Sequence, residues 1–215
     1  FFTEGVGAGP RKHMDILGLA MNDGADLRVH PSGKAVVSIS AQTQGQGHET
    51  TFAQIVAEEL GIPPEDVEVR AGDTDRSPYG LGTYGSRSTP VSGAAVAVVS
   101  RKVRDKARQI AGTMLEASPD DLAWEKGRWY VKGDPEKGAS IDEIAARAYS
   151  GEEMPEGMEG GLDAQVIYDP PNLTYPYGAY IAVVDIDADT GHVSIRRFIA
   201  VDDCGVRINP MVVDG

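Results

Sequence analysis

The chain has 215 residues and an apolar fraction of 41%, enough for one large globular domain or two small ones with a buried core. Its formal charge of -13 argues against nucleic acid or an anionic membrane as a partner, and no apolar run approaches the roughly 20 residues of a membrane span. The single cysteine, Cys204, excludes an internal disulfide and is typical of a reducing, cytoplasmic compartment.

The first predicted elements follow a glycine-rich segment, residues 1–24. This segment includes GVGAGP, a weak match to a dinucleotide fingerprint, because no strand precedes it and Pro10 stands where a helix should begin. Residues 26–42 then alternate between polar and apolar as two strands around the turn HPSGK. We expect an antiparallel pair there.

A helix is predicted from about Thr50 to Leu60, because its apolar residues recur on one stripe and Gly61 stops the pattern. A short strand at 67–69 follows. Residues 71–91 form a long irregular segment, and connections of this length inside a compact domain are usually functional or disordered. Its tyrosines and arginine favour function.

A long helix is predicted from Ser92, with apolar residues at spacings of three and four. DLAWEKGRWYVKG reads as a hairpin, residues 141–149 as a short helix, and residues 179–203 as two strands joined by DADTG. The chain then closes on VVDG, an apolar strand-like run. Strands and helices mix without strict alternation, so the predicted fold class is α+β, with mixed sheets and packed helices.

Two glycine-rich polar loops each stand directly before a predicted helix. They are GQGHETT, at 45–51, and GLGTYGSRSTPVSG, at 80–93. A helix N-terminus exposes unpaired N–H groups and a partial positive charge, and glycine lets an anion approach the backbone closely. Either loop alone is more simply a turn with a helix cap. Two together favour a ligand that carries phosphate.

Polar side chains in these loops add groups that can recognise a heterocycle: Gln46, His48, Tyr84, Ser86, Arg87 and Ser88. Arg87 is the candidate phosphate ligand, because a guanidinium can donate two parallel hydrogen bonds to a phosphate group. No second histidine or carboxylate stands at metal-site spacing from His48, so no metal ligand is predicted. From the residues alone, the prediction ends at a phosphate-bearing ligand.

Four stretches in sequence make the chain recognisable: SAQTQGQGHETT, GDTDRSPYGLGTYGSRST, PPNLTYPYGAY and DDCGVRINP. Together they resemble the large, molybdopterin-binding subunits of the xanthine oxidase family of molybdenum hydroxylases, in particular its carbon monoxide dehydrogenase branch. The resemblance covers nearly the whole chain except GEEMPEGMEGG, at 151–161. It implies a molybdopterin dinucleotide as ligand, in bacteria usually the cytosine form.

The resemblance implies a set of cofactor-binding residues. In the first loop they are Gln44, Gly45, Gln46, Gly47 and His48, with Gln46 facing the pterin. In the second loop they are Gly82, Thr83, Tyr84, Gly85, Ser86, Arg87 and Ser88. Asp203 and Cys204 would lie near the dinucleotide.

The resemblance also implies what this chain lacks. The family's catalytic base is a glutamate in a glycine-rich segment near the C-terminus, and no such segment is present here. The carbon monoxide enzymes hold copper through a cysteine in an upstream loop, and Cys204 stands in a different motif. We therefore expect a middle fragment of a large subunit, without catalytic residues of its own and inactive in isolation.

The expected organisation is a glycine-rich segment at 1–24, a cofactor-binding α+β domain at 25–150, and the start of a second, β-rich subdomain at 151–215. By resemblance, the partners are the rest of the large subunit and iron–sulfur and flavin subunits, in an oligomer of heterotrimers. The parent would oxidise carbon monoxide to carbon dioxide with water as oxygen source. Oxidation of an aldehyde or N-heterocycle, or a non-catalytic nucleotide-binding or assembly domain, are the alternatives.

Overall fold

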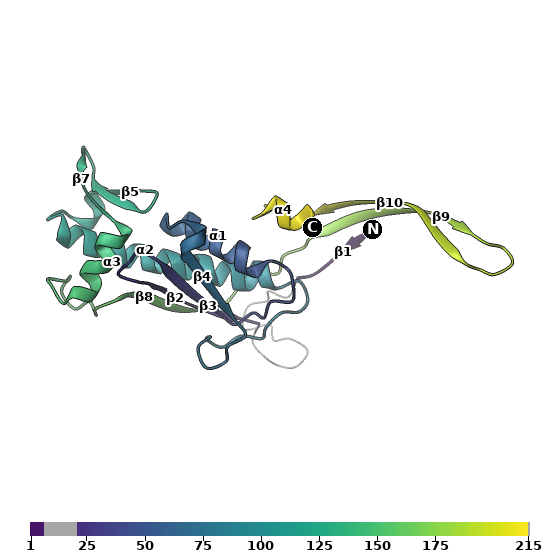
Figure 1. The fold of residues 1–215 in the computed structure, drawn as a ribbon, viewed down its shortest axis with the longest axis horizontal. Coiled ribbons are helices and arrows are strands. Elements are labelled where there is room, and N and C mark those ends of the chain that lie inside the picture. The colour runs from purple at the N-terminus through teal and green to yellow at the C-terminus, as the bar shows by residue number, and fades with distance from the viewer. Residues whose placement is uncertain (7–20, 215) are drawn as a thin grey trace.

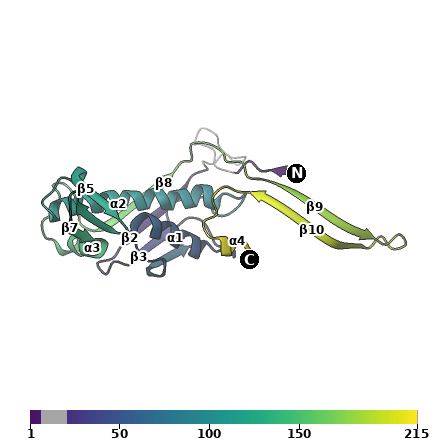
Figure 2. The ribbon, with the colours of Figure 1, turned by 90° about the horizontal axis from the view of Figure 1, so that it is seen from above.

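The computed structural model describes residues 1–6 and 21–214. The fold has a body of helices on a sheet, from which a long two-stranded hairpin projects (Figures 1 and 2). None of the helices in the described ranges is long and apolar enough to cross a membrane. The mixed helices and sheets confirm the α+β fold class.

The central sheet has four strands in the order β4-β3-β2-β8. They are β2 (Asp23–Val29), β3 (Ala35–Ile39), β4 (Val67–Ala71) and β8 (Leu162–Tyr168). β2 pairs antiparallel with β3 and β8, whereas β3 and β4 are parallel. Alternate residues of β2 and β3 are buried on one face, where the core begins: Ala25, Leu27, Val29, Ala35, Val37 and Ile39.

Two long helices cover that face of the sheet (Figure 1). α1 (His48–Leu60) connects the parallel strands β3 and β4, and it ends at Gly61 in the left-handed conformation. A short 3-10 helix, Pro64–Asp66, precedes β4. α2 (Ala94–Met114) continues without interruption from a π-helix, Ser88–Gly93. Both predicted helices are present, and each helical segment begins before its predicted first residue.

A small subdomain lies at the far end of α2 (Figure 2). It contains a 3-10 helix, Pro119–Asp121, and a three-stranded antiparallel sheet of β5 (Leu122–Glu125), β6 (Arg128–Val131) and β7 (Asp134–Ser140). α3 (Ile141–Ser150) follows, and a capping box between Ser140 and Glu143 fixes its first turn. The predicted hairpin and short helix are therefore present, and β7 extends the hairpin to three strands.

The projecting hairpin consists of β9 (Tyr177–Ile186) and β10 (Val193–Asp203), with a register shift between Ile195 and Arg197. β1 (Phe2–Thr3) pairs with the base of β9, and α4 (Pro210–Asp214) lies beside the base of the hairpin. Nearly all hairpin residues are exposed in the described part of the chain.

One expectation from the sequence needs correction. The closing VVDG run was predicted as strand-like, but residues 210–214 form a helix, because Asn209 Oδ1 accepts the N–H groups of Met211 and Val212 and so caps a helical turn. The expected division at residue 150 stays a prediction; beyond that residue, β8 pairs with β2 along seven residues. Residues 7–20 of the glycine-rich segment lie outside the described residues.

Candidate functional site

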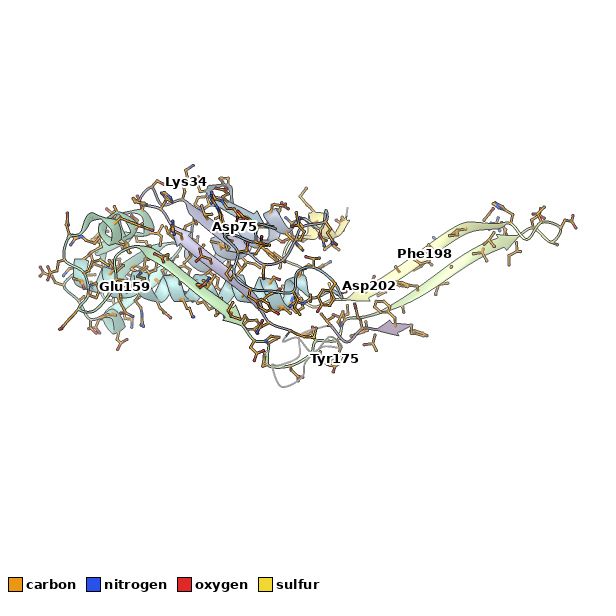
Figure 3. The ribbon with its side chains drawn as sticks, turned by 90° about the horizontal axis from the view of Figure 1, so that it is seen from below. Lys34, Asp75, Glu159, Tyr175, Phe198 and Asp202 are labelled. Carbon is orange, nitrogen blue, oxygen red and sulfur yellow. The ribbon has the colours of Figure 1, made fainter. Side chains whose placement is uncertain are left out.

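A cleft of about 810 Å³ lies where the two glycine-rich loops meet the base of the hairpin. The first loop supplies Gln46 and His48, the second supplies Ser86, and the hairpin end supplies Asp202 to Asn209. Figure 3 shows Tyr175 and Asp202 near this junction, whereas Phe198 lies out on the hairpin. The stretch PPNLTYPYGAY supplies Thr174 to Tyr177, so four regions that the sequence singled out separately line one cleft.

The first loop leads into the N-terminus of α1 with its backbone accessible. Gly45 has φ 97° and Gly47 has φ 73°, conformations that side chains other than glycine rarely adopt. A Cβ at Gly45 would meet nothing within 4 Å. Within the described residues no side chain caps α1, so no side-chain acceptor takes the N–H groups of its first turn. The Gln46 side chain folds back, and its Oε1 accepts the Gln44 N–H at 2.5 Å.

His48 is the buried polar group of the first loop. Its side chain is 4% exposed and stacks on Phe52 with ring centroids 5.0 Å apart. Nδ1 is buried and has no hydrogen-bond partner among the described residues. Burial lowers the pKa of His48 below its ordinary value of 6.5, with the Glu49 carboxylate acting in the opposite direction. The first loop thus holds a neutral imidazole with one unused nitrogen beside the cleft.

The second loop has a similar open backbone. Gly82 and Gly85 have positive φ and open space where a Cβ would stand, and Ser86 adopts φ 57° although it is not glycine. The Thr83 hydroxyl donates to the carbonyl oxygen of Gln42, which joins the two loops directly. The Ser86 hydroxyl donates to Glu4 at 2.7 Å. The loops are therefore held in a fixed relation to each other.

Arg87, the residue predicted to bind phosphate, does not line the cleft. Its side chain is 0% exposed, and Nη1 lies 2.8 Å from Asp23 Oδ2. Nη1 also donates to the Gly82 carbonyl at 2.7 Å, and Nη2 donates to the carbonyls of Met21 and Asn22, each at 3.2 Å. The guanidinium is therefore engaged with the protein and fixes the loop from behind. Ser88 is also buried.

At the hairpin base, two tyrosines hold two aspartates. The Tyr180 hydroxyl donates to Asp202 at 2.7 Å, and the Tyr177 hydroxyl donates to Asp203 at 3.0 Å. The Gly205 N–H and the Tyr177 hydroxyl hold the pKa of Asp203 below its ordinary range, and the same contact raises the pKa of Tyr177. Cys204 is an exposed free thiol that lines the cleft.

Of the predicted site residues, five line the cleft: Gln46, His48, Ser86, Asp203 and Cys204. The others in the two loops lie behind or beside it. Sequence reasoning missed Glu4, Thr51 and Asn209, which also line the cleft, and it missed Asp23 behind it. Asn209 reaches Gln54 of α1 at 3.0 Å. Isolated residues of this kind give no local signal, because their partners are distant in the sequence.

The described residues contain no group of three or more His, Cys, Asp or Glu side chains that could hold a metal ion. Among the described residues, the cleft is lined by the carboxylates Glu4, Asp202 and Asp203 and the guanidinium of Arg207, beside backbone and neutral side chains. Residues 1–215 match the family described as the molybdopterin cofactor-binding domain, and the chain belongs to that family. The resemblance predicted from the four motifs is thereby confirmed.

Particular relatives come from the molybdenum hydroxylases. The chain is 56% identical over 214 residues to the carbon monoxide dehydrogenase large chain of Hydrogenophaga pseudoflava, covering 100% of this chain and 26% of that protein. The solved structure of carbon monoxide dehydrogenase from Oligotropha carboxidovorans matches with TM-score 0.91 and 55% identity, over 100% of this chain and 26% of that one. Quinoline 2-oxidoreductase from Pseudomonas putida 86 matches with TM-score 0.87 and 39% identity, over 99% and 27%. The chain spans about a quarter of each.

Proposed function

We propose that this chain is the part of a molybdenum hydroxylase large subunit that holds the dinucleotide end of a molybdopterin cofactor, in its cytosine form. The family match and the large-chain relatives support the cofactor class. The structural support is the meeting of both glycine-rich loops and the DDCG turn in one cleft. The 810 Å³ volume is in the range of small-molecule and cofactor sites.

The observation that carries the proposal is the unpartnered, buried His48 Nδ1 at an uncapped helix N-terminus. An anion at α1 would accept backbone N–H groups, and His48 would offer a neutral hydrogen-bonding group to the same ligand. With Arg87 engaged elsewhere, the basic side chain that lines the described cleft is Arg207. Phosphate recognition would therefore depend mainly on backbone N–H groups.

The residues present fit such a ligand. The open backbone at Gly45, Gly82 and Gly85 lets phosphate oxygens approach more closely than any Cβ would allow. Gln46 would turn from its own loop toward the pterin. When bound, the molybdenum of the cofactor supplies the redox chemistry, and this chain's residues hold and orient the ligand. No catalytic residue is assigned within the chain.

The whole protein would oxidise carbon monoxide to carbon dioxide, with water as oxygen source. It would pass electrons to iron–sulfur and flavin subunits in a cytoplasmic oligomer of heterotrimers. Copper would require a thiolate in another part of the subunit. The likeness to quinoline 2-oxidoreductase favours an N-heterocycle as the second candidate substrate class. Dye reduction by the full-length enzyme with carbon monoxide and with quinoline separates the two.

The cofactor role is tested by His48→Phe in the full-length large chain. Phenylalanine keeps the stacking on Phe52 and removes the ring nitrogens. We expect lower molybdenum and pterin content per polypeptide, measured by elemental analysis and pterin fluorescence. His30→Phe, at an exposed turn, is the matched control and should keep full content. Equal content in both variants would remove His48 from the cofactor site.

A further inference from the structure

A buried acidic side chain, Asp23, stands at the start of β2 behind the second loop. It is 0% exposed and accepts hydrogen bonds through both oxygens. Oδ1 accepts the Leu81 N–H at 3.1 Å, and Oδ2 accepts Arg87 Nη1 at 2.8 Å and the Ser92 hydroxyl. Buried carboxylates are costly unless they are paired in this way, so the cluster has a defined geometry.

Three segments meet at this carboxylate: the start of the sheet, the second glycine-rich loop and the π-helix that leads into α2. Ser92 lies in the π-helix and is 0% exposed. Asp23 also forms a backbone bridge with Gly80, at which a Cβ would stand 2.2 Å from Asp23 Oδ1. The carboxylate therefore contacts the loop at its first residues and, through Arg87, at its last.

Arg87 extends the contact into the middle of the loop, since its Nη1 also donates to the Gly82 carbonyl. Gly82, Gly85 and Ser86 hold left-handed backbone conformations; for Ser86, which is not glycine, this conformation costs energy unless surrounding contacts determine it. Neither Asp23 nor Arg87 lines the cleft. They act from behind the loop, on the face away from the ligand.

We propose that Asp23 is the positioning residue of the second loop. Through Arg87, Leu81 and Ser92 it holds residues 80–88 in the conformation that places Ser86 at the cleft. The consequence for cofactor binding rests on the function proposed above; the effect on the loop itself does not. The cluster is thus a rigid support for the ligand-facing loop.

Ser92→Ala tests the proposal, because it removes one hydroxyl from Asp23 and leaves the ion pair in place. Ser100→Ala is the matched control: Ser100 is also 0% exposed, lies farther along the same helical run, and donates to the Val96 carbonyl at 2.8 Å. Hydrogen exchange is followed by mass spectrometry on the full-length large chain in its cofactor-free form. In Ser92→Ala, peptides covering 80–88 should exchange about tenfold faster, the equilibrium effect of one hydrogen bond to a charged group.

Peptides of α2 should exchange alike in both variants, which separates loop opening from general destabilisation. Unchanged exchange at 80–88 in Ser92→Ala, or equal acceleration in Ser100→Ala, would overturn the positioning role. Asp23→Asn should give a larger effect in the same peptides.

The effect on cofactor binding is measured separately, on the full-length enzyme that contains its cofactor. Ser92→Ala should lower molybdenum content per polypeptide severalfold and leave the rate per bound molybdenum unchanged. Faster loop exchange with full molybdenum content would keep the positioning role and refute the assignment of this loop to the cofactor.

Discussion

Replacing Arg87 by lysine should destabilise the folded chain by about 2–4 kcal/mol, although the charge is kept. The guanidinium reaches four acceptors through two nitrogens: Asp23 Oδ2, the Gly82 carbonyl and the carbonyls of Met21 and Asn22. An ammonium is a single point with three donors, so at least one acceptor loses its partner. A hydrogen bond that involves a charged group contributes about 1.5–3 kcal/mol, and a buried acceptor left alone costs about 1–3 kcal/mol.

Arg87→Met should cost more, about 3–5 kcal/mol, because it leaves the Asp23 carboxylate buried without its partner. The measurement is urea unfolding of the chain followed by circular dichroism. Arg101→Lys is the control, since Arg101 pairs with Glu59 at 2.6 Å but its side chain is 57% exposed, so the change should stay within about 1 kcal/mol. If Arg87→Lys costs less than the control while cofactor content in the full-length chain falls, Arg87 is a phosphate ligand after all and the structural reasoning fails.

Three further changes test other parts of the molecule. Burial lowers the pKa of His48 in the folded state, so the unfolded chain takes up the proton first as pH falls below about 6.5, and the free energy of unfolding should decline there. The decline should be smaller in His48→Phe, and equal pH profiles for the two proteins would exclude the effect. Gly82→Ala and Gly133→Ala introduce the same strain, at φ 79° and 88° with open space around both, and each should cost about 1–2 kcal/mol in urea unfolding. Only Gly82→Ala should reduce cofactor content in the full-length chain, and an equal loss in Gly133→Ala would contradict the loop assignment. The isolated chain should self-associate through its exposed hairpin, and Phe198→Lys, at a position 58% exposed, should shift sedimentation toward the monomer; an unchanged profile would place the contact elsewhere.

The sequence predicted those elements whose signal is local. α1 and α2 follow from apolar spacing, and Gly61 ends α1 as expected. β8 was missed because its residues are only half-buried, and its partner β2 lies far away in the sequence. The start of the second helical segment at Ser88 was also missed, since residues 88–91 were assigned to the long irregular segment 71–91, whereas Ser88–Gly93 form a π-helix.

The candidate site, too, could be predicted from the sequence only in part. Glycine in both loops indicated a backbone that a ligand can approach closely, and Gly45, Gly47, Gly82 and Gly85 all adopt positive φ. Which side chains face the ligand could not be predicted, because this depends on partners elsewhere in the chain. Arg87 shows the difficulty: its position before a helix suggested phosphate, but its carboxylate partner stands 64 residues away.

The engagement of Arg87 with Asp23 changes how the cleft can recognise a dinucleotide. A free arginine would bind phosphate through a flexible side chain, at an entropic cost on each binding event. Under the proposed function, the cation stabilises the loop in advance through the Gly82 carbonyl, and the loop would offer backbone N–H groups whose positions are already set. The formal charge of -13 is then compatible with an anionic ligand, because the attraction comes from local dipoles rather than from net charge. Among the described residues, Arg207 is the Lys or Arg side chain that lines the cleft, so binding should depend only weakly on salt.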